Sequence, residues 1–379
     1  MGEQTSIEWT EATWNPIRGC SVLSPGCHNC YAMKIASRFG GPGQPFEGFA
    51  KDGQWTGRVE LARERLAMPI GWLPTRVFVN SMSDVFHKKL SNDDIMAVFG
   101  AMAAAPQVTF QVLTKRADRM SAWFRWAAEE FRLAGRFNVP AMIEHAACFA
   151  RRAGDERGAD RLFARANKRA GVMEWPLRNV HLGVSVEDQQ RADERVPELL
   201  GCPAAVRFIS VEPLLERVEL GRWLTAAWQC SYCHRFFRGD LFRVCPECGR
   251  EGGWTGSVPR LSWAIVGGES GPDARPFDVA WARSLVKQCR AASVPVFVKQ
   301  LGANVRARND EGWEAITGCE ENERTWPIED MDAVERNPNG FREEHQGAEV
   351  RVHLNDRKGG DPAEWPSDLR VREFPEARS

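Results

Sequence analysis

The chain has 379 residues, 43% of them hydrophobic and 27% charged, a composition typical of a soluble globular protein. Its 50 Lys and Arg nearly balance 51 Asp and Glu, so the net charge excludes a globally basic nucleic-acid binder and leaves room only for a local basic surface. No apolar run approaches the roughly 20 residues of a membrane span, and no signal peptide opens the chain. Eleven cysteines without an export signal favour reduced thiols, metal ligation and a cytoplasmic location.

The first informative segment is the loop over residues 13–31, in which Cys20, Cys27 and Cys30 stand at C-x6-C-x2-C. Its Gly and Pro residues allow the backbone to fold around a compact object, and a helix is predicted over residues 31–39. Three thiolates are one short of the four that close a zinc or cubane site. The loop therefore predicts either a [4Fe–4S] cluster with one iron left open or a zinc ion completed by His28 or another residue.

Six short apolar runs, rich in β-branched and aromatic residues, predict buried strands. A capping box over residues 91–94 and an N-cap at Asp278 predict helices between them. This alternation favours an α/β fold with a parallel sheet, a partial or full (β/α) barrel. The six runs span residues 76–84, 108–116, 180–187, 206–213, 263–270 and 294–302.

Polar residues follow each predicted strand, at the end where barrel enzymes carry their active sites. Any one of them alone is more often a turn residue, but six such ends at one barrel mouth would form a polar cavity. These residues are Asn80, Ser81, Ser83, Asp84, Thr114, Lys115, Arg116, Ser185, Glu187, Ser210, Glu212, Glu269, Ser270, Lys299 and Gln300.

Two insertions interrupt the predicted barrel, which spans residues 1–302. The first, residues 117–175, is helix-rich and contains a basic stretch that is either a solvated helix face or a contact for a phosphate backbone. The basic residues are Arg151, Arg152, Arg161, Arg165, Lys168 and Arg169.

The second insertion, residues 228–256, carries two CxxC pairs separated by eleven residues, the spacing of a four-thiolate zinc ribbon that depends on its metal to fold. The ribbon is either a structural staple or a grip on nucleic acid or a partner protein through Arg235, Arg238, Arg243 and Arg250. Residues 303–379 predict a C-terminal extension that wraps the barrel or covers its mouth. The predicted zinc ligands are Cys230, Cys233, Cys245 and Cys248.

Several segments together resemble the phage-associated three-cysteine-motif family, an uncharacterised branch similar to radical SAM proteins. The resemblance covers most of the chain, with the two insertions as additions. It differs from common radical SAM enzymes in its longer first cysteine spacing and in a Gly-Gly-Glu that comes late, at residues 267–269. The matching segments are Trp14-Asn-Pro, Gly19-Cys20, residues 24–31, 81–87, 113–116, 183–187, 210–213, 267–272, Lys299-Gln and the tail from Trp365.

The resemblance implies that Cys20, Cys27 and Cys30 ligate a [4Fe–4S] cluster and that S-adenosylmethionine chelates the fourth iron. One electron would then cleave the sulfonium to a 5′-deoxyadenosyl radical, and the implied electron donor is a flavodoxin or ferredoxin. By position, the implied contacts to the methionine moiety are Asn80, Ser81 and Ser83, and Asp84 is a further cofactor-binding residue. Ser185 and Glu187 would bind the ribose, and Lys115, Glu212, Glu269 and Lys299 would face substrate or relay protons.

Two classes of function follow from these features. The first is a radical-SAM-like enzyme acting on a nucleotide or nucleic acid, by base modification or lesion repair, with an operon-encoded partner protein and no membrane contact. The alternative is a non-catalytic, zinc-dependent module that binds nucleic acid or protein. A metal-dependent hydrolase is disfavoured because no HxH or His/Asp cluster follows a predicted strand, and His87 and His181 stand alone.

Overall fold

The computed structural model divides the chain into two compact units. Unit 1 comprises residues 1–185, 194–208 and 378–379, and unit 2 comprises residues 186–193 and 209–377. The structure describes residues 3–130, 132–133, 136–169, 175–225, 227–233, 236–238, 244–251, 253–308, 325–327, 349–352 and 354–375.

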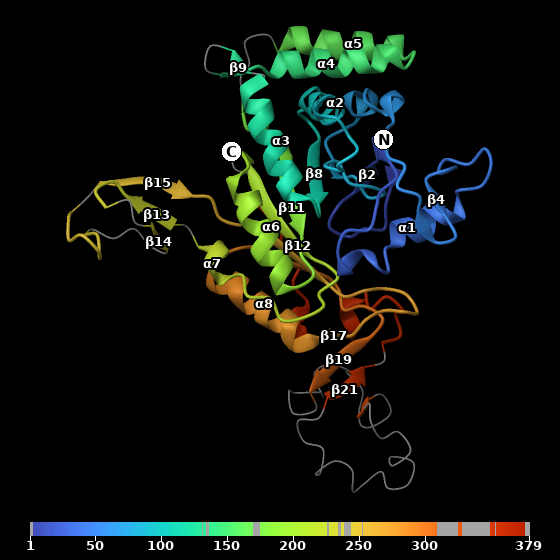
Figure 1. The fold of residues 1–379 in the computed structure, drawn as a ribbon. Helices are drawn as coiled ribbons and strands as arrows, with labels where there is room; N and C mark the ends of the chain where they lie inside the picture. The colour runs from blue at the N-terminus through green and yellow to red at the C-terminus, as the bar shows by residue number, and fades with distance from the viewer. Residues whose placement is uncertain are drawn as a thin grey trace, which may run out of the picture. The chain divides into compact units, whose positions relative to one another are not determined.

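Unit 1 is built on parallel strands (Figure 1). Their side chains are almost all buried. Val, Phe and Leu dominate these strands, which is the composition that burial on both faces of a sheet requires. A short strand β1 (Glu3–Gln4) pairs antiparallel with the first of them. The parallel strands are paired in the order β2 (Ala12–Trp14), β7 (Arg76–Val79), β8 (Thr109–Thr114) and β11 (Val180–Ser185).

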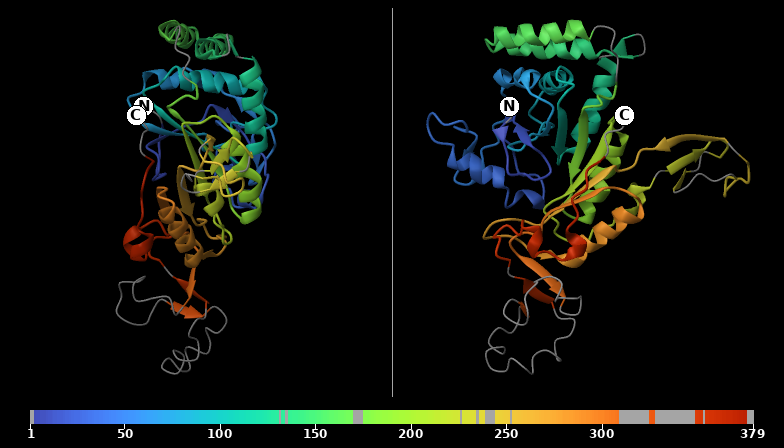
Figure 2. Two further views of the ribbon diagram at one scale, coloured as in Figure 1. Left: turned by 90° about the vertical axis from the view of Figure 1, so that its left-hand side faces the viewer. Right: turned by 180° about the vertical axis from the view of Figure 1, so that it is seen from behind.

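Helices follow the strands of unit 1, beginning with α2 (Asn92–Ala103) after β7 and α3 (Ala117–Glu130) after β8. The predicted capping box at Ser91 is confirmed, because the Ser91 hydroxyl accepts from Asp94 N–H and the Asp94 carboxylate accepts from Ser91 N–H. Helices α4 (Val139–Arg152) and α5 (Glu156–Lys168) form a hairpin and lie side by side in both views of Figure 2. Helix α4 packs on α2, so the hairpin is anchored to unit 1.

The cysteine loop of unit 1 is bounded by short elements. Strand β3 (Ile17–Arg18), which pairs with β6 (Glu60–Leu61) from farther along the chain, precedes the loop, and α1 (Tyr31–Arg38) follows it. The remaining short elements are η1 (Pro25–Cys27), β4 (Ala50–Lys51), β5 (Gln54–Trp55), η2 (Arg63–Arg65), η3 (Met68–Gly71), β9 (Arg132–Leu133) and β10 (Arg136–Phe137).

Unit 2 has its own parallel pair, β16 (Trp263–Gly267) and β18 (Val296–Gln300), joined by helix α8. The helix begins as predicted, because the Asp278 carboxylate accepts from Ala280 N–H. A four-stranded sheet follows in the order β17-β19-β21-β20, and the cysteine insertion forms the three-stranded sheet β14-β13-β15. Their bounds are α7 (Gly221–Leu224), β13 (Ala227–Cys230), β14 (Phe236–Arg238), β15 (Trp254–Val258), β17 (Phe277–Asp278), α8 (Val279–Ala291), β19 (Val305–Arg308), β20 (Thr325–Pro327), β21 (Glu349–Val352), η4 (Pro362–Glu364) and η5 (Ser367–Leu369).

The tail of unit 2 returns to strand β18. Val298 N–H donates to Val371 O at 2.8 Å, and Glu373 N–H donates to Val296 O at 3.0 Å. The indole of Trp263 donates to Glu373 O at 2.8 Å. These three hydrogen bonds hold the tail along the edge of β18.

The prediction of an α/β fold is confirmed. Strand β12 (Val206–Val211) and helix α6 (Gln189–Gly201) contain residues of both units. The strand order of the sheet is β1-β2-β7-β8-β11-β12-β16-β18, in which seven strands are parallel. This is the topology of a partial (β/α) barrel. All six predicted strands occur, and the short strand β2 is the one parallel strand of this sheet that was not predicted.

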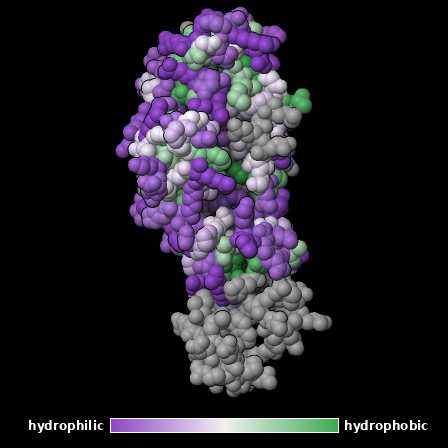
Figure 3. Space-filling view, turned by 90° about the vertical axis from the view of Figure 1, so that its right-hand side faces the viewer, coloured by the Kyte–Doolittle hydropathy of each residue, from purple (hydrophilic) through white to green (hydrophobic). Residues whose placement is uncertain are grey.

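The surface of the described residues is mostly polar on the face shown in Figure 3, where hydrophobic residues are scattered among hydrophilic ones. Within the described part of the chain, no helix has the length and apolarity needed to cross a membrane.

Candidate functional site

Cys30 is the N-cap of α1, Cys27 ends the turn η1 and Cys20 stands earlier in the loop, and all three are partly exposed. Gly19 sets the approach of the chain to Cys20, since its φ is +83° and a Cβ there would stand 2.0 Å from Arg58 O. Burial raises the pKa of the Cys20 thiol to about 12 and also raises that of Cys30. The N–H groups of Ala32 and Met33, in the first turn of α1, oppose that rise at Cys30.

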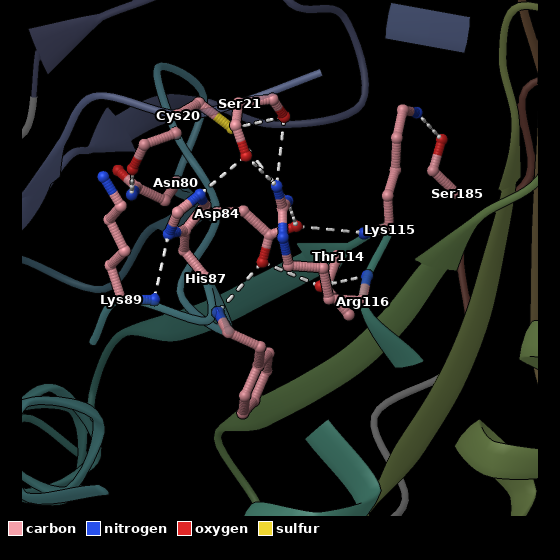
Figure 4. Close-up of polar contacts among 12 residues, drawn as sticks. Cys20, Ser21, Asn80, Asp84, His87, Lys89, Thr114, Lys115, Arg116 and Ser185 are labelled. Carbon is pink, nitrogen blue, oxygen red and sulfur yellow. Dashed lines mark hydrogen bonds and ion pairs between the residues drawn. The ribbon is translucent and has the colours of Figure 1, made fainter. Parts of the chain in front are cut away.

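A buried ion pair ties this loop to the carboxyl ends of β7 and β8 (Figure 4). Arg116 Nη1 lies 2.9 Å from Asp84 Oδ2, and both side chains are less than a tenth exposed. The other arm of the guanidinium, Nη2, donates to Ser21 O at 3.0 Å and to Ser21 Oγ at 3.1 Å. Arg116 Nη1 also lies 4.0 Å from Cys20 Sγ. One arginine therefore fixes the backbone next to Cys20 and places a cation beside its sulfur.

Asp84 is the centre of this arrangement. Its carboxylate accepts from Thr114 Oγ1 at 2.8 Å, Lys115 N–H at 3.1 Å and Phe86 N–H at 2.9 Å, besides Arg116. These donors fill the carboxylate, so its contacts are those of a positioning group.

His87 closes the other side of the loop and is fully buried. Its Nε2 lies 2.8 Å from Ser21 Oγ, and its Nδ1 accepts from Lys89 N–H at 3.2 Å, so Nδ1 carries no proton. Burial, together with the nearby Arg116 cation, lowers the pKa of His87 to about 4.

The polar residues after β7 are held by the strand that precedes the cysteines. Asn15 Oδ1 accepts from Ser81 Oγ at 3.1 Å and from Met82 N–H at 3.0 Å. Ser83 Oγ donates to Ile17 O at 3.1 Å, and Asn80 Nδ2 contacts Ser83 Oγ. Asn80 Oδ1 is a buried acceptor without a hydrogen-bond partner among the described residues. It is the side-chain oxygen of this group that has capacity for a ligand.

Lys115 and Ser185 meet at the carboxyl ends of β8 and β11, where Lys115 Nζ donates to Ser185 Oγ (Figure 4). Lys115 also lies near enough to Cys30 for its charge to act on that thiol. Unit 1 thus brings together eight predicted strand-end residues with the cysteine loop, namely Asn80, Ser81, Ser83, Asp84, Thr114, Lys115, Arg116 and Ser185.

Unit 2 holds a second group of predicted residues at its own strand ends. Lys299 Nζ forms an ion pair with Glu212, and both side chains are about one-fifth exposed. Glu269 is held by Arg275 in a bidentate pair, with Nη2–Oε1 at 2.7 Å and Nε–Oε2 at 3.0 Å. Glu187 is fully buried, and its carbonyl accepts from Leu215 N–H at 2.9 Å.

The four cysteines of the insertion form a cluster with the geometry of a metal site. Their sulfurs all lie within 4.8 Å of one another. Cys230 Sγ and Cys248 Sγ are 3.8 Å apart, and Cys233 Sγ and Cys245 Sγ are 3.7 Å apart. A tetrahedral ion with Zn–S bonds of 2.3 Å places its sulfurs about 3.8 Å apart, so these residues fit zinc. The N–H of Cys233, aided by the N–H of Tyr232 and the neighbouring cysteine sulfurs, lowers the pKa of Cys230 to about 7, although burial opposes this.

The three-cysteine loop differs from this cluster. Among the described residues, the four-cysteine group is the one that brings three or more His, Cys, Asp or Glu ligand atoms to the spacing of a metal site, and Cys20, Cys27 and Cys30 do not form such a group. A [4Fe–4S] cubane is larger than a single ion, so its ligand sulfurs lie farther apart than those of a zinc site.

The sequence analysis named Arg116 without giving it a role, and it missed Asn15, Ser21 and Arg275. Asn15 belongs to the Trp14-Asn-Pro segment, which matched the family pattern and could have identified Asn15 as a site residue. Arg275 follows Glu269 by six residues and had no signal beyond its charge. Cys319, Arg235 and Arg243 lie outside the described residues, as does the side chain of Arg238.

Comparison with known proteins gives one match. A family model described as "Protein of unknown function (DUF5131)" matches residues 4–350. No curated protein and no solved structure matches the chain.

Proposed function

The chain belongs to the DUF5131 family, and we propose that it is a radical-SAM-like iron–sulfur enzyme acting on a nucleotide or a nucleic acid. The observation that carries the proposal is that Cys20, Cys27 and Cys30 are partly exposed free thiols in one loop. The buried ion pair between Arg116 and Asp84 holds that loop in place. Three such ligands leave one iron of a cubane open, which a purely structural site does not need.

In this proposal Cys20, Cys27 and Cys30 hold a [4Fe–4S] cluster. When bound, the cluster and S-adenosylmethionine supply a one-electron cleavage of the sulfonium that delivers a carbon-centred radical to the substrate. Arg116 fixes the loop beside Cys20, and its charge raises the reduction potential of whatever metal the sulfur holds. The buried position of the ion pair keeps water from the side of the loop that Arg116 faces.

The remaining residues orient the small molecule and the substrate. Asn80 Oδ1 is the acceptor we assign to the methionine amine, with Ser81, Ser83 and Asp84 shaping that side of the site. Ser185, next to Lys115, is assigned to the ribose together with Glu187. Lys115 and the Glu212–Lys299 pair are proton donors and acceptors for the reaction. Glu269, whose carboxylate is oriented by Arg275, has the same role.

The proposal also covers the protein's surroundings. An electron donor such as a flavodoxin or ferredoxin supplies the electron, and the cytoplasm keeps the thiols reduced. The four-cysteine cluster holds a structural zinc ion. Phage association and an operon-encoded partner protein belong to the same proposal.

Anaerobic reconstitution with iron and sulfide tests the proposal. We expect about four irons per chain, a thiolate-to-iron absorbance band, and release of 5′-deoxyadenosine when S-adenosylmethionine and a reductant are added. Cys27→Ala should abolish the band and the release. Cys148→Ala, which removes an exposed thiol on α4, is the matched control and should change neither.

The ribbon provides the second arm of the experiment. Cys233→Ala should lose one zinc per chain and keep the iron, because its ligand set is separate from the loop. Two zinc ions per chain and no iron after reconstitution would instead identify the alternative function, a non-catalytic zinc-dependent binding module.

A further inference from the structure

Helix α5 carries four basic side chains on one face. Arg157, Arg161, Arg165 and Lys168 follow one another at intervals of four or three residues. At about 100° per residue they fall within an arc of about 80°. The buried residues of α5 lie on another side of the helix, and α4 packs against α5. We call these four residues the α5 basic stripe.

The acidic side chains of α5 pair with α4 and not with the α5 basic stripe. The two acidic side chains of α5, Glu156 and Asp160, both pair with Arg151 of α4, at 3.0 and 2.9 Å. Within the described part of the chain, the α5 basic stripe has no acidic partner. Like charges one turn apart on a helix repel, so the stripe lowers the stability of α5 until an anion neutralises it.

The spacing of the charges in the α5 basic stripe suits a polymer with regularly spaced phosphates. Eleven residues separate its first and last members, which is about 16 Å of helix, or about five phosphates along one strand of a duplex. Three of the four side chains are arginines, whose planar fork binds phosphate oxygens in pairs.

An anionic membrane surface fits less well. Of the apolar residues of α5, Ala159, Leu162 and Ala166 are buried, Phe163 is half-buried against the Arg151 guanidinium, and Ala164 is small and exposed. The helix therefore has no broad apolar face to insert among lipids. The top of Figure 3, at the height of α4 and α5 in Figure 1, is mainly hydrophilic.

We propose that the α5 basic stripe binds the phosphodiester backbone of a nucleic acid, DNA or RNA, without reading its sequence. The inference deepens the proposed function by naming the surface that would hold such a substrate, and it rests on that function for the link between binding and reaction. Binding of a nucleic acid requires no cluster, so an experiment can refute the binding surface without refuting the proposed radical chemistry, and the reverse.

Fluorescence anisotropy with labelled 24-base-pair DNA and RNA duplexes tests the stripe in the full chain carrying Cys27→Ala, which lacks the proposed cluster. The triple variant Arg157→Gln, Arg161→Gln and Arg165→Gln should bind about 10- to 100-fold more weakly near 0.1 M salt. The slope of log affinity against log salt should fall by about three. Gln preserves the helix propensity, and circular dichroism checks the fold.

The matched control removes the same charge from arginines that have acidic partners and lie outside the hairpin, by Arg217→Gln, Arg222→Gln and Arg283→Gln. This variant should keep both affinity and salt slope within about twofold. Equal losses in both triple variants would overturn the proposal, as would absence of binding to either duplex. Stripe-dependent binding to phosphatidylserine vesicles without duplex binding would assign the surface to a membrane instead. Loss of duplex binding in the stripe variant alone supports the proposal, whatever the outcome of the iron reconstitution.

Discussion

At the scale of single residues, Arg116 joins parts of unit 1 that lie far apart in the sequence. It contacts Asp84, 32 residues before it, and Ser21, 95 residues before it. Arg116→Gln leaves the Asp84 carboxylate buried without its cation, which should lower the free energy of unfolding by about 3–5 kcal/mol. Urea denaturation followed by circular dichroism measures this loss.

Two further variants separate the ion pair from a general effect of charge. Arg116→Lys should recover little, since one ammonium group cannot reach both Asp84 and the Ser21 carbonyl as the guanidinium fork does. Arg217→Gln removes an arginine whose partner Glu219 is exposed and should cost less than about 1 kcal/mol. Similar losses for Arg116→Gln and Arg217→Gln would refute the role given to the buried pair.

His181, on strand β11, should make stability depend on pH. Burial lowers its pKa to about 4, below the unfolded value near 6.5. As the pH falls below 6.5, the unfolded chain takes up a proton before the folded chain does. The free energy of unfolding therefore falls between pH 6.5 and 4, and this contribution is complete above 6.5.

The variant His181→Asn cannot titrate, so its urea midpoint should change less than that of the parent chain between pH 6.5 and 4. His145→Asn removes a partly exposed histidine that contacts Asp93 and should leave the parent's pH dependence in place. Parallel pH profiles for the parent and His181→Asn would contradict the assignment.

At the scale of elements, Gly100 determines how closely α2 and α4 approach. A Cβ at Gly100 would stand 2.0 Å from Met142 O and 2.7 Å from the carbonyl carbon. Gly100→Ala should gain about 1 kcal/mol of helix propensity but force the two backbones apart, with a net destabilisation of about 1–3 kcal/mol. Gly201→Ala, at the end of α6 with open space around its Cβ, should be neutral or stabilising by thermal unfolding. Stabilisation by both substitutions would show that α4 can move away without cost.

Local patterns predicted the elements better than the contacts between them. The capping box at Ser91, the N-cap at Asp278 and the four-cysteine spacing depend on residues close in sequence, so their geometry follows from local chemistry. Strand β2 was missed because its three residues, Ala12–Trp14, are too short to show a periodic pattern. The pairing of Arg116 with Asp84 depends on β7 and β8 being neighbours, which no local pattern specifies.

The same limit applied to the candidate site. Polar residues at strand ends were predicted as a group, since parallel strands end at one edge of a sheet. Which of them would be satisfied by protein partners could not be predicted. The structure divides them: Asp84 and Glu269 are filled by arginines, while Asn80 keeps a buried acceptor atom without a partner among the described residues.

At the scale of the whole chain, the C-terminal segment completes a sheet formed much earlier in the sequence. It covers the edge of β18, which would otherwise offer unpaired backbone groups to another chain. Trp365 anchors the segment: it is fully buried, and its indole donates to Gly359 O at 3.0 Å. Trp365→Ala should therefore lower the free energy of unfolding by about 3–5 kcal/mol and increase aggregation through the exposed strand edge.

Light scattering during thermal unfolding, together with urea denaturation, measures both effects. Arg357→Ala alters an exposed side chain of the same segment and should stay within about 0.5 kcal/mol of the parent chain. If Trp365→Ala also stayed within that range, the tail would be packed against β18 without stabilising it. The edge of the sheet would then need another protection, because a parallel strand such as β18 pairs readily through a free edge.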